Sequence, residues 1–165
     1  DPPIMALPLA WPGQTTDKLV ERWESDVLPR LGKDADNRLV VGLGSHDLGL
    51  TSTARSRLHL ANLLDNAHRQ DLPTFVVGPG PRLDVPQRDQ EALTRAFAEV
   101  CERRSVPYVD CYTPLKNHEQ WLTDMAMSPD GYSPRQAGYG LITWLILHRG
   151  WHSWLGIDAP VSVSD

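Results

Sequence analysis

The alternation of short apolar runs with longer helical stretches constrains this chain more than any other feature. Runs rich in Val and Leu cover 38–44, 74–78 and 106–110, and they have the length of buried strands. Apolar residues at helical spacing occupy the stretches at about 17–31, 53–70, 87–104 and 134–148. Strands that alternate with helices are typical of parallel β-α units, so we expect a three-layer α/β/α domain with a mostly parallel sheet.

One further strand is predicted near the start of the chain. The apolar stretch PIMALPLA, in the region 4–11, precedes PGQTT and the first helix, which Thr15 or Thr16 would cap. We found no linker, repeat or low-complexity segment, and 165 residues can bury about two-thirds of the surface of the unfolded chain. A single domain over 1–165 is therefore expected.

Composition narrows the classes of partner. The formal net charge is −5 and no cluster of Lys and Arg occurs, which argues against nucleic acid or an anionic membrane and favours a small neutral or weakly charged ligand. Thirteen of the 16 basic residues are Arg, a bias that suggests a GC-rich bacterial gene. The chain has no apolar run of membrane-spanning length and no signal-peptide pattern, so a cytoplasmic protein is expected.

Metals, cofactors and disulfides are not expected. Cys101 and Cys111 lack metal-type spacing and are predicted to be buried, reduced thiols. The pair His46-Asp47 is only weakly typical of a metal-dependent phosphohydrolase, because the other histidines show no ligand spacing. The glycines around SHD do not follow the spacing of a nucleotide-binding loop.

The loops that carry function can be predicted from the fold class. Ligands of open α/β sheets bind outside the carboxyl ends of the strands, here the segments 11–16, 44–52, 78–86 and 110–133. His46 follows the strand 38–44 directly, beside Gly44. It is either a loop residue bonded to the backbone or a group that donates to an oxyanion or exchanges a proton near neutral pH.

The stretch SPDGYSPRQAGYG, residues 128–140, combines a turn with a helix start. Asp130-Gly131 is an ordinary turn pair. Ser133, Pro134 and Gln136 form a capping box, with Ser133 as the N-cap and Pro134 at the first helical position. Helix initiation thus explains Ser133 but not Asp130.

Taken together, these segments resemble the SGNH (GDSL-type) hydrolase family in order over most of the chain. PLAWPGQTTDKLVERW is similar to the family's second block, VVGLGSHDL to its third and SPDGYSPRQAGYG to its fifth, while TFVVGPGP before a helix also suits it. The resemblance implies a flavodoxin-like sheet and acyl-ester hydrolysis on a small substrate. It also implies that the backbone N–H of Gly13 belongs to an oxyanion hole.

The resemblance implies a set of catalytic roles that this chain only partly matches. The family uses a serine nucleophile, a histidine base, an aspartate three residues before that histidine, and glycine and asparagine oxyanion donors. Gly13 and Asp130 match, whereas His46 stands at the asparagine position and Ser133 at the histidine position. A serine hydroxyl is too weakly basic to replace histidine near neutral pH. The candidate catalytic residues are Asp130, Ser133 and His46, and the candidate oxyanion or substrate-binding residues are Gly13, Gly44 and His46.

The first block of the family, a strand followed by G-D-S, has no counterpart here, because DPPIMALPLA already corresponds to the second strand. The absent strand would lie between the second and third strands of a 2-1-3-4-5 sheet. Either upstream residues supply it, or the sheet closes differently, or a second chain or another copy completes the sheet; upstream residues are the favoured explanation.

Three functions are compatible with this pattern. The first is an acyl-ester hydrolase of the SGNH type whose serine lies outside this chain. The second is a repurposed, non-hydrolytic enzyme, for instance one that catalyses a biosynthetic, acid/base or rearrangement reaction with His46 and Asp130. The third is a non-catalytic protein that binds a small molecule in the inherited pocket.

Overall fold

A parallel sheet lies at the centre of the protein, as the alternating pattern predicted. The computed structural model describes residues 3–49 and 52–161. Its strands are β1 (Leu39–Gly42), β2 (Thr74–Val77) and β3 (Tyr108–Val109), in the spatial order β1-β2-β3. All pairs are parallel, with Leu39 opposite Thr74 and Val77 opposite Val109. All three strands fall within the ranges that the apolar runs predict.

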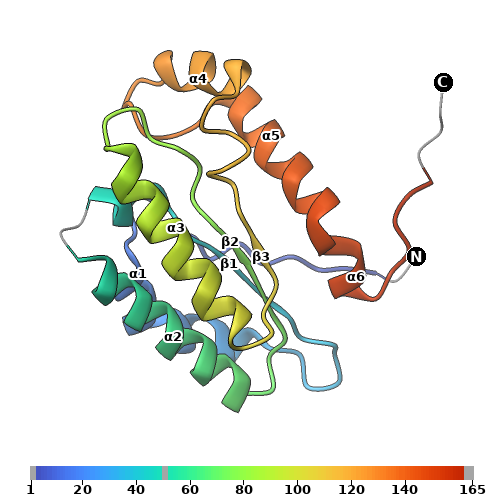
Figure 1. Cartoon of the computed structure of the whole chain (residues 1–165). Helices are drawn as coiled ribbons and strands as arrows, with labels where there is room; N and C mark the ends of the chain where they lie inside the picture. Colours follow the sequence, from blue (N-terminus) through green and yellow to red (C-terminus); the bar gives the residue numbers. More distant parts are fainter. Residues whose placement is uncertain (1–2, 50–51, 162–165) are drawn as a thin grey trace.

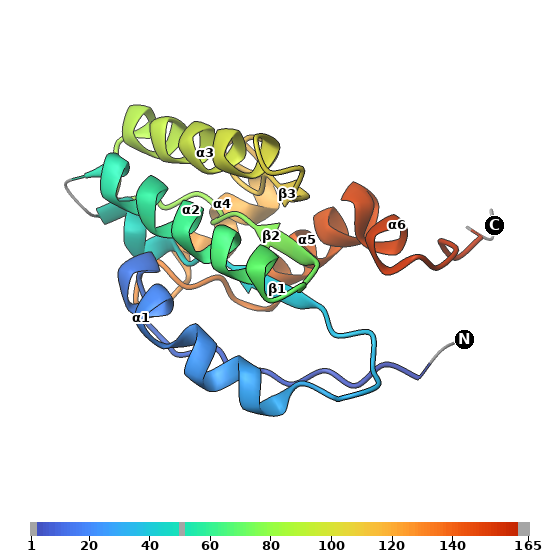
Figure 2. The ribbon, with the colours of Figure 1, turned by 90° about the horizontal axis from the view of Figure 1, so that it is seen from below.

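Helices cover both faces of this sheet (Figure 1). They are α1 (Thr16–Val27), α2 (Thr53–Arg69), α3 (Gln87–Glu102), α4 (Glu119–Ala126), α5 (Gln136–Ile146) and α6 (His152–Leu155). Short turns of tighter or wider helix are η1 (Leu28–Arg30), η2 (Ser45–Gly49) and η3 (Leu147–Trp151). Figure 2 shows α2 and α3 on one side of the strands and α5 and α6 on the other, which confirms the three-layer arrangement.

Two hydrophobic cores fill the space between the layers. Val41 and Val76 point into the core shared with α1, α2 and α3, together with Trp23, Leu60 and Phe97. The opposite face of β2 carries Phe75 and Val77, which pack with Trp121, Met125 and Leu145 from α4 and α5. Successive side chains of a strand point to opposite faces, so β2 contributes to both cores.

The C-terminal aromatic residues close the second core. The ring of Phe75 lies 5.3 Å from that of Trp151 and 5.2 Å from that of Trp154, measured between centroids. Aromatic pairs at this separation add to the stabilisation from burial alone. The path bends at Arg149 and Gly150, whose backbone angles are not helical, and the bend brings α6 back onto the sheet.

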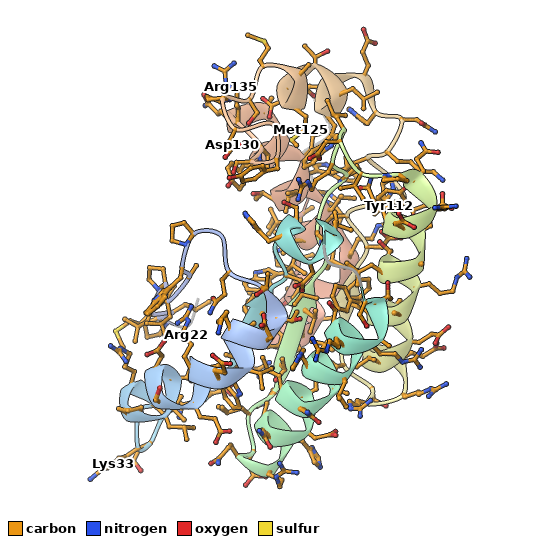
Figure 3. All side chains as sticks on the ribbon, turned by 90° about the vertical axis from the view of Figure 1, so that its left-hand side faces the viewer. Arg22, Lys33, Tyr112, Met125, Asp130 and Arg135 are labelled. Atoms are coloured by element: carbon orange, nitrogen blue, oxygen red, sulfur yellow. The ribbon has the colours of Figure 1, made fainter. Side chains whose placement is uncertain are left out.

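The prediction of a strand over 4–11 is wrong. In the part of the chain that the structure describes, residues 3–11 form no strand. Most of their large apolar side chains are exposed, from 50% for Leu7 to 81% for Met5, while Leu9 is half-buried. Arg22 of α1 holds the end of this segment, donating to the Leu9 carbonyl (2.9 Å) and lying over the Trp11 ring (4.4 Å). Figure 3 shows Arg22 between α1 and this segment. The apolar run alone does not make a strand because a strand also needs a neighbour that accepts its hydrogen bonds.

Strand β1 lies at one end of the described sheet. The N–H groups of Leu39 in β1 and of Leu43, which directly follows it, donate toward β2, to the carbonyls of Pro73 (2.9 Å) and Val77 (2.8 Å). In a parallel ladder alternate residues face opposite neighbours, so Val40 and Gly42 direct their backbone groups away from β2. Within residues 3–49 and 52–161 no strand pairs with this edge.

Three further features concern the leucines of α2, the two cysteines and the length of the helices. On α2 the buried leucines are Leu60, Leu63 and Leu64, whereas the side chain of Leu58 is 58% exposed. Cys101 and Cys111 are free, buried thiols as predicted, and burial raises the pKa of each to about 12. In the described residues no helix is long and apolar enough to span a membrane.

Candidate active site

The candidate residues gather at the carboxyl ends of β1 and β2. The turn at Gly13 precedes α1, η2 follows β1, the loop 78–86 follows β2, and the turn 128–133 precedes α5. These are four of the segments that the fold class singled out. Figure 3 shows Asp130 and Arg135 at the end of the molecule where α4 lies, opposite Lys33.

Gly13, Gly44 and His46 lie against one another. A β-carbon built on Gly13 would come 3.7 Å from Nε2 of His46, and one built on Gly44 would come 3.8 Å from Nδ1. Gly13 has a φ of +71°, a left-handed conformation that favours glycine. The structure thus brings together the three candidate oxyanion or substrate-binding residues, with the His46 ring close to both glycines.

Asp47 ties this group to the start of α1. Both of its carboxylate oxygens accept from the backbone N–H of Thr16, at 3.1 and 3.3 Å, and its side chain is buried. Burial raises the pKa of Asp47 above its ordinary value, and the Thr16 donor partly offsets that effect. The contact holds η2 against the helix that follows Gly13. Sequence reasoning weighed Asp47 only as a metal ligand, and its position directly after His46 was the available signal for this role.

Asp130 is committed to its own turn. One oxygen, Oδ1, accepts from Ser128 Oγ (2.8 Å), from the Tyr132 N–H (3.0 Å) and from the Ser133 N–H (2.7 Å). Ser133 and the Tyr132 N–H hold the pKa of this carboxylate well below its usual range, and Asp130 is exposed. Asp130 therefore stays ionised and shapes the turn 128–133.

Ser133 is not the N-cap of α5, so the predicted capping box is wrong. The helix begins at Gln136 with Arg135 as its N-cap, and the Ser133 N–H is already bonded to Asp130. The Arg135 N–H instead donates to Oδ2 of Asp124, a buried carboxylate from α4, at 2.6 Å. A carboxylate from another helix satisfies the first turn, which the local sequence could not indicate.

Tyr132 connects the turn 128–133 with His46. The two rings meet edge to face with centroids 4.9 Å apart, and Ser45 Oγ donates to the Tyr132 carbonyl at 3.4 Å. Arg82 also contacts this group, with its guanidinium carbon 5.2 Å from the Tyr132 ring centroid. Sequence reasoning missed both Tyr132 and Arg82; their only signal was a place in two of the loops already singled out.

Two open hollows of the described surface are not part of this group. One lies against α4 and is lined by residues that include His118 and Asp124. The other lies against α3 and includes Asp110 and Lys116. In the described ranges no three His, Cys, Asp or Glu side chains are grouped so that they could hold a metal ion.

The chemistry open to the candidate residues differs between the group around His46 and the turn 128–133. An imidazole flanked by two glycine backbones can stabilise a developing oxyanion or exchange a proton. Ser133, beside Asp130, offers a hydroxyl where general-base chemistry needs an imidazole. Gly13, Gly44 and His46 therefore lie together, whereas the turn 128–133 offers no imidazole.

Comparison with known proteins places the chain in a family. The sequence profile of the GDSL-like lipase/acylhydrolase family matches residues 3–141, which is most of the chain. The protein therefore belongs to the GDSL-like lipase/acylhydrolase family. Membership supports a hydrolase-like function. A search of curated proteins found no match.

Solved structures of hydrolases share the fold. A lipase/acylhydrolase from Enterococcus faecalis superposes with a TM-score of 0.67 at 22% identity, covering 91% of this chain and 75% of that one. A GDSL-like lipase from Bacteroides thetaiotaomicron gives a TM-score of 0.63 at 21% identity, covering 82% and 70%. A psychrotrophic esterase from Pseudoalteromonas gives 0.62 at 16% identity, covering 87% and 74%. At these identities the likeness concerns the fold.

Proposed function

We propose that this protein is an acyl-ester hydrolase-like protein that binds the carbonyl group of a small substrate between Gly13, Gly44 and His46. The observation that carries the proposal is the packing of the His46 ring against both glycines, with 3.7 Å from Nε2 to a β-carbon built on Gly13. Attack on an acyl carbon moves negative charge onto the carbonyl oxygen, and donors aimed at that oxygen lower the barrier. His46 contributes an N–H donor in place of the asparagine amide.

Turnover of p-nitrophenyl acetate tests this function. His46→Ala should lower the rate by about 10²–10³-fold, the usual effect of losing one oxyanion donor. His46→Asn restores a donor of similar reach and should recover most of the loss. His68→Ala is the matched control, because His68 is an exposed histidine on α2, and it should leave the rate unchanged.

Binding of a charged mimic separates recognition from catalysis. Methylphosphonate carries oxygens like those of a tetrahedral intermediate, so it should shift the amide NMR signals of Gly13 and Gly44 in the wild type but not in His46→Ala. Absence of both turnover and these shifts would contradict the proposal. Shifts without turnover would indicate the second candidate function.

The second candidate is a non-hydrolytic enzyme or a small-molecule-binding protein on the same site. The favouring observation is the turn 128–133, where one oxygen of Asp130 already accepts three hydrogen bonds and Ser133 replaces an imidazole. Ser133→His should raise ester hydrolysis if the rest of a hydrolytic site is present. An unchanged rate in Ser133→His, together with retained methylphosphonate binding, would favour this second candidate.

A further inference from the structure

Arg82 is anchored more firmly than its loop position suggests. Its backbone N–H donates to Oε1 of Gln90 (2.8 Å), and Nε2 of Gln90 donates back to the Arg82 carbonyl (2.9 Å) and to that of Val85 (2.7 Å). Gln90 lies on α3 and is only 2% exposed. The loop after β2 is thus hydrogen-bonded to the buried face of α3, and these bonds fix the backbone of Arg82.

The guanidinium of Arg82 reaches two other loops of the site. Nη1 donates to the carbonyl of Ser45 in η2 (3.3 Å), and the group lies 5.2 Å from the centroid of the Tyr132 ring. Nε and Nη2 donate to the two oxygens of Asp84, at 2.8 and 2.6 Å. The side chain is 13% exposed.

These contacts argue for positioning rather than for substrate binding. The Asp84 carboxylate compensates the charge of Arg82. It also occupies the guanidinium edge formed by Nε and Nη2, which is the edge that would otherwise bind an anionic substrate. The other contacts of Arg82, with the Ser45 carbonyl and the Tyr132 ring, connect the loop after β2 to the loop after β1 and to the turn before α5. Tyr132 links Arg82 to His46, since its ring contacts both side chains.

We propose that Arg82 is a positioning residue that presses Tyr132 against His46 and thereby sets the orientation of the imidazole between Gly13 and Gly44. As a contribution to catalysis this inference rests on the proposed function, whereas the orientation itself can be measured without any substrate. Only the planar, five-donor guanidinium satisfies Asp84, Ser45 and the Tyr132 ring together, so Lys should replace it poorly.

The resonance of the His46 ring proton Cε1–H reports this orientation, because the Tyr132 ring shifts nearby protons. Tyr132→Leu should move that resonance and Tyr132→Phe, which keeps a ring, should largely preserve it. Arg82→Gln should move it in the same direction as Tyr132→Leu. The double variant Arg82→Gln/Tyr132→Leu should add little to Tyr132→Leu alone, since both remove one interaction.

Controls keep the test falsifiable. Arg88→Gln is the matched variant, because Arg88 is an arginine of the same region whose side chain is 87% exposed, and it should leave the His46 resonance unchanged. If Arg82→Gln fails to fold, Arg82→Lys can be used instead, because it keeps the positive charge but lacks the planar guanidinium. It should still move the His46 resonance part of the way. Amide exchange at Tyr132 and Ser133 should become about tenfold faster in the Arg82 variants.

Two results would overturn the inference: a His46 resonance that is unmoved in Arg82→Gln and Arg82→Lys, or shifts from Arg82 and Tyr132 that simply add. Failure of the proposed function would look different. In that case the resonance would respond to Arg82 as described, while p-nitrophenyl acetate turnover would be absent from the wild type as well.

Discussion

Strands β1 and β2 run side by side and both come from short apolar runs, LVVG and TFVV, yet their surroundings differ sharply. Every residue of β2 is buried, whereas β1 is buried only at Val41. Val40 is 47% exposed and its register partner, Phe75, is 0% exposed. An apolar run therefore predicts a strand, but the neighbours on each edge and face of that strand decide how much it contributes to stability.

Truncation of Phe75 in β2 is the most sensitive test of this difference in burial. Phe75→Ala should lower the free energy of unfolding by about 3–5 kcal/mol, because it removes a fully buried ring that contacts Trp151 and Trp154. Urea unfolding measures the change. Leu58→Ala, at a 58% exposed position of α2, is the control and should cost less than about 1 kcal/mol. Equal losses at the two positions would contradict the two-core description.

A second test uses two adjacent valines of β1 that face opposite sides of the sheet. Val41→Ala should cost about 2–3 kcal/mol, since Val41 is 4% exposed within the core against α2. Val40→Ala should cost less than about 1 kcal/mol. The same urea titration separates them. A large loss at Val40 would mean that its face is covered in solution.

The turns around His46 allow a smaller test that concerns the site. Gly13→Ala should cost about 1–2 kcal/mol, because its φ of +71° disfavours a β-carbon. Gly44→Ala is the matched control, since its β-carbon would meet neighbours no closer than 3.6 Å. Thermal unfolding compares the pair. A stability of Gly13→Ala equal to that of the wild type would argue against the described turn.

The pH dependence of stability should reflect two carboxylates of the candidate site, Asp47 and Asp130, and these changes should be smaller than those above. The pKa of Asp47 is raised by burial, so the folded state binds its proton more tightly and stability falls as pH rises from the unfolded value of 3.8 through the folded pKa. Asp47→Asn lacks this titration, and its unfolding free energy should therefore decline less over that range. Urea unfolding at several pH values gives the slope.

Asp130 should show the opposite sign. Its pKa is lowered by its hydrogen bonds, so its contribution is present above the unfolded value of 3.8 and is lost as pH falls through the folded pKa. Asp130→Asn should lose stability relative to the wild type at neutral pH and approach it in acid. Two slopes of the same sign would contradict the assigned environments.

Much of the fold could be predicted from local patterns. The helix expected over 53–70 is Thr53–Arg69, and the strand expected over 74–78 is Thr74–Val77. These succeeded because periodicity is a property of neighbouring residues. The strand predicted over 4–11 failed for the opposite reason, since pairing depends on a distant edge that no local pattern describes.

The candidate site divides in the same way. Short motifs were sufficient to propose Gly44, His46 and Asp130, because each follows a strand or stands in a turn pair, and the family resemblance added Gly13. The parts played by Arg82 and Asp124 could not be predicted. Arg82 donates to Ser45, 37 residues away, and Asp124 accepts from Arg135, 11 residues away, across a turn that had seemed to cap itself.

Local patterns in the sequence were enough to place β1, β2, β3 and the longer helices, because hydrophobic period acts over a few residues, and the quoted motifs were enough to indicate the family. The packing of the layers settled which apolar stretches are covered, that a carboxylate of α4 accepts from the backbone at the start of α5, and that the Tyr132 ring contacts both Arg82 and His46. Those outcomes depend on hydrogen bonds and ring contacts between segments far apart in the chain, and such contacts exist only once the layers have packed.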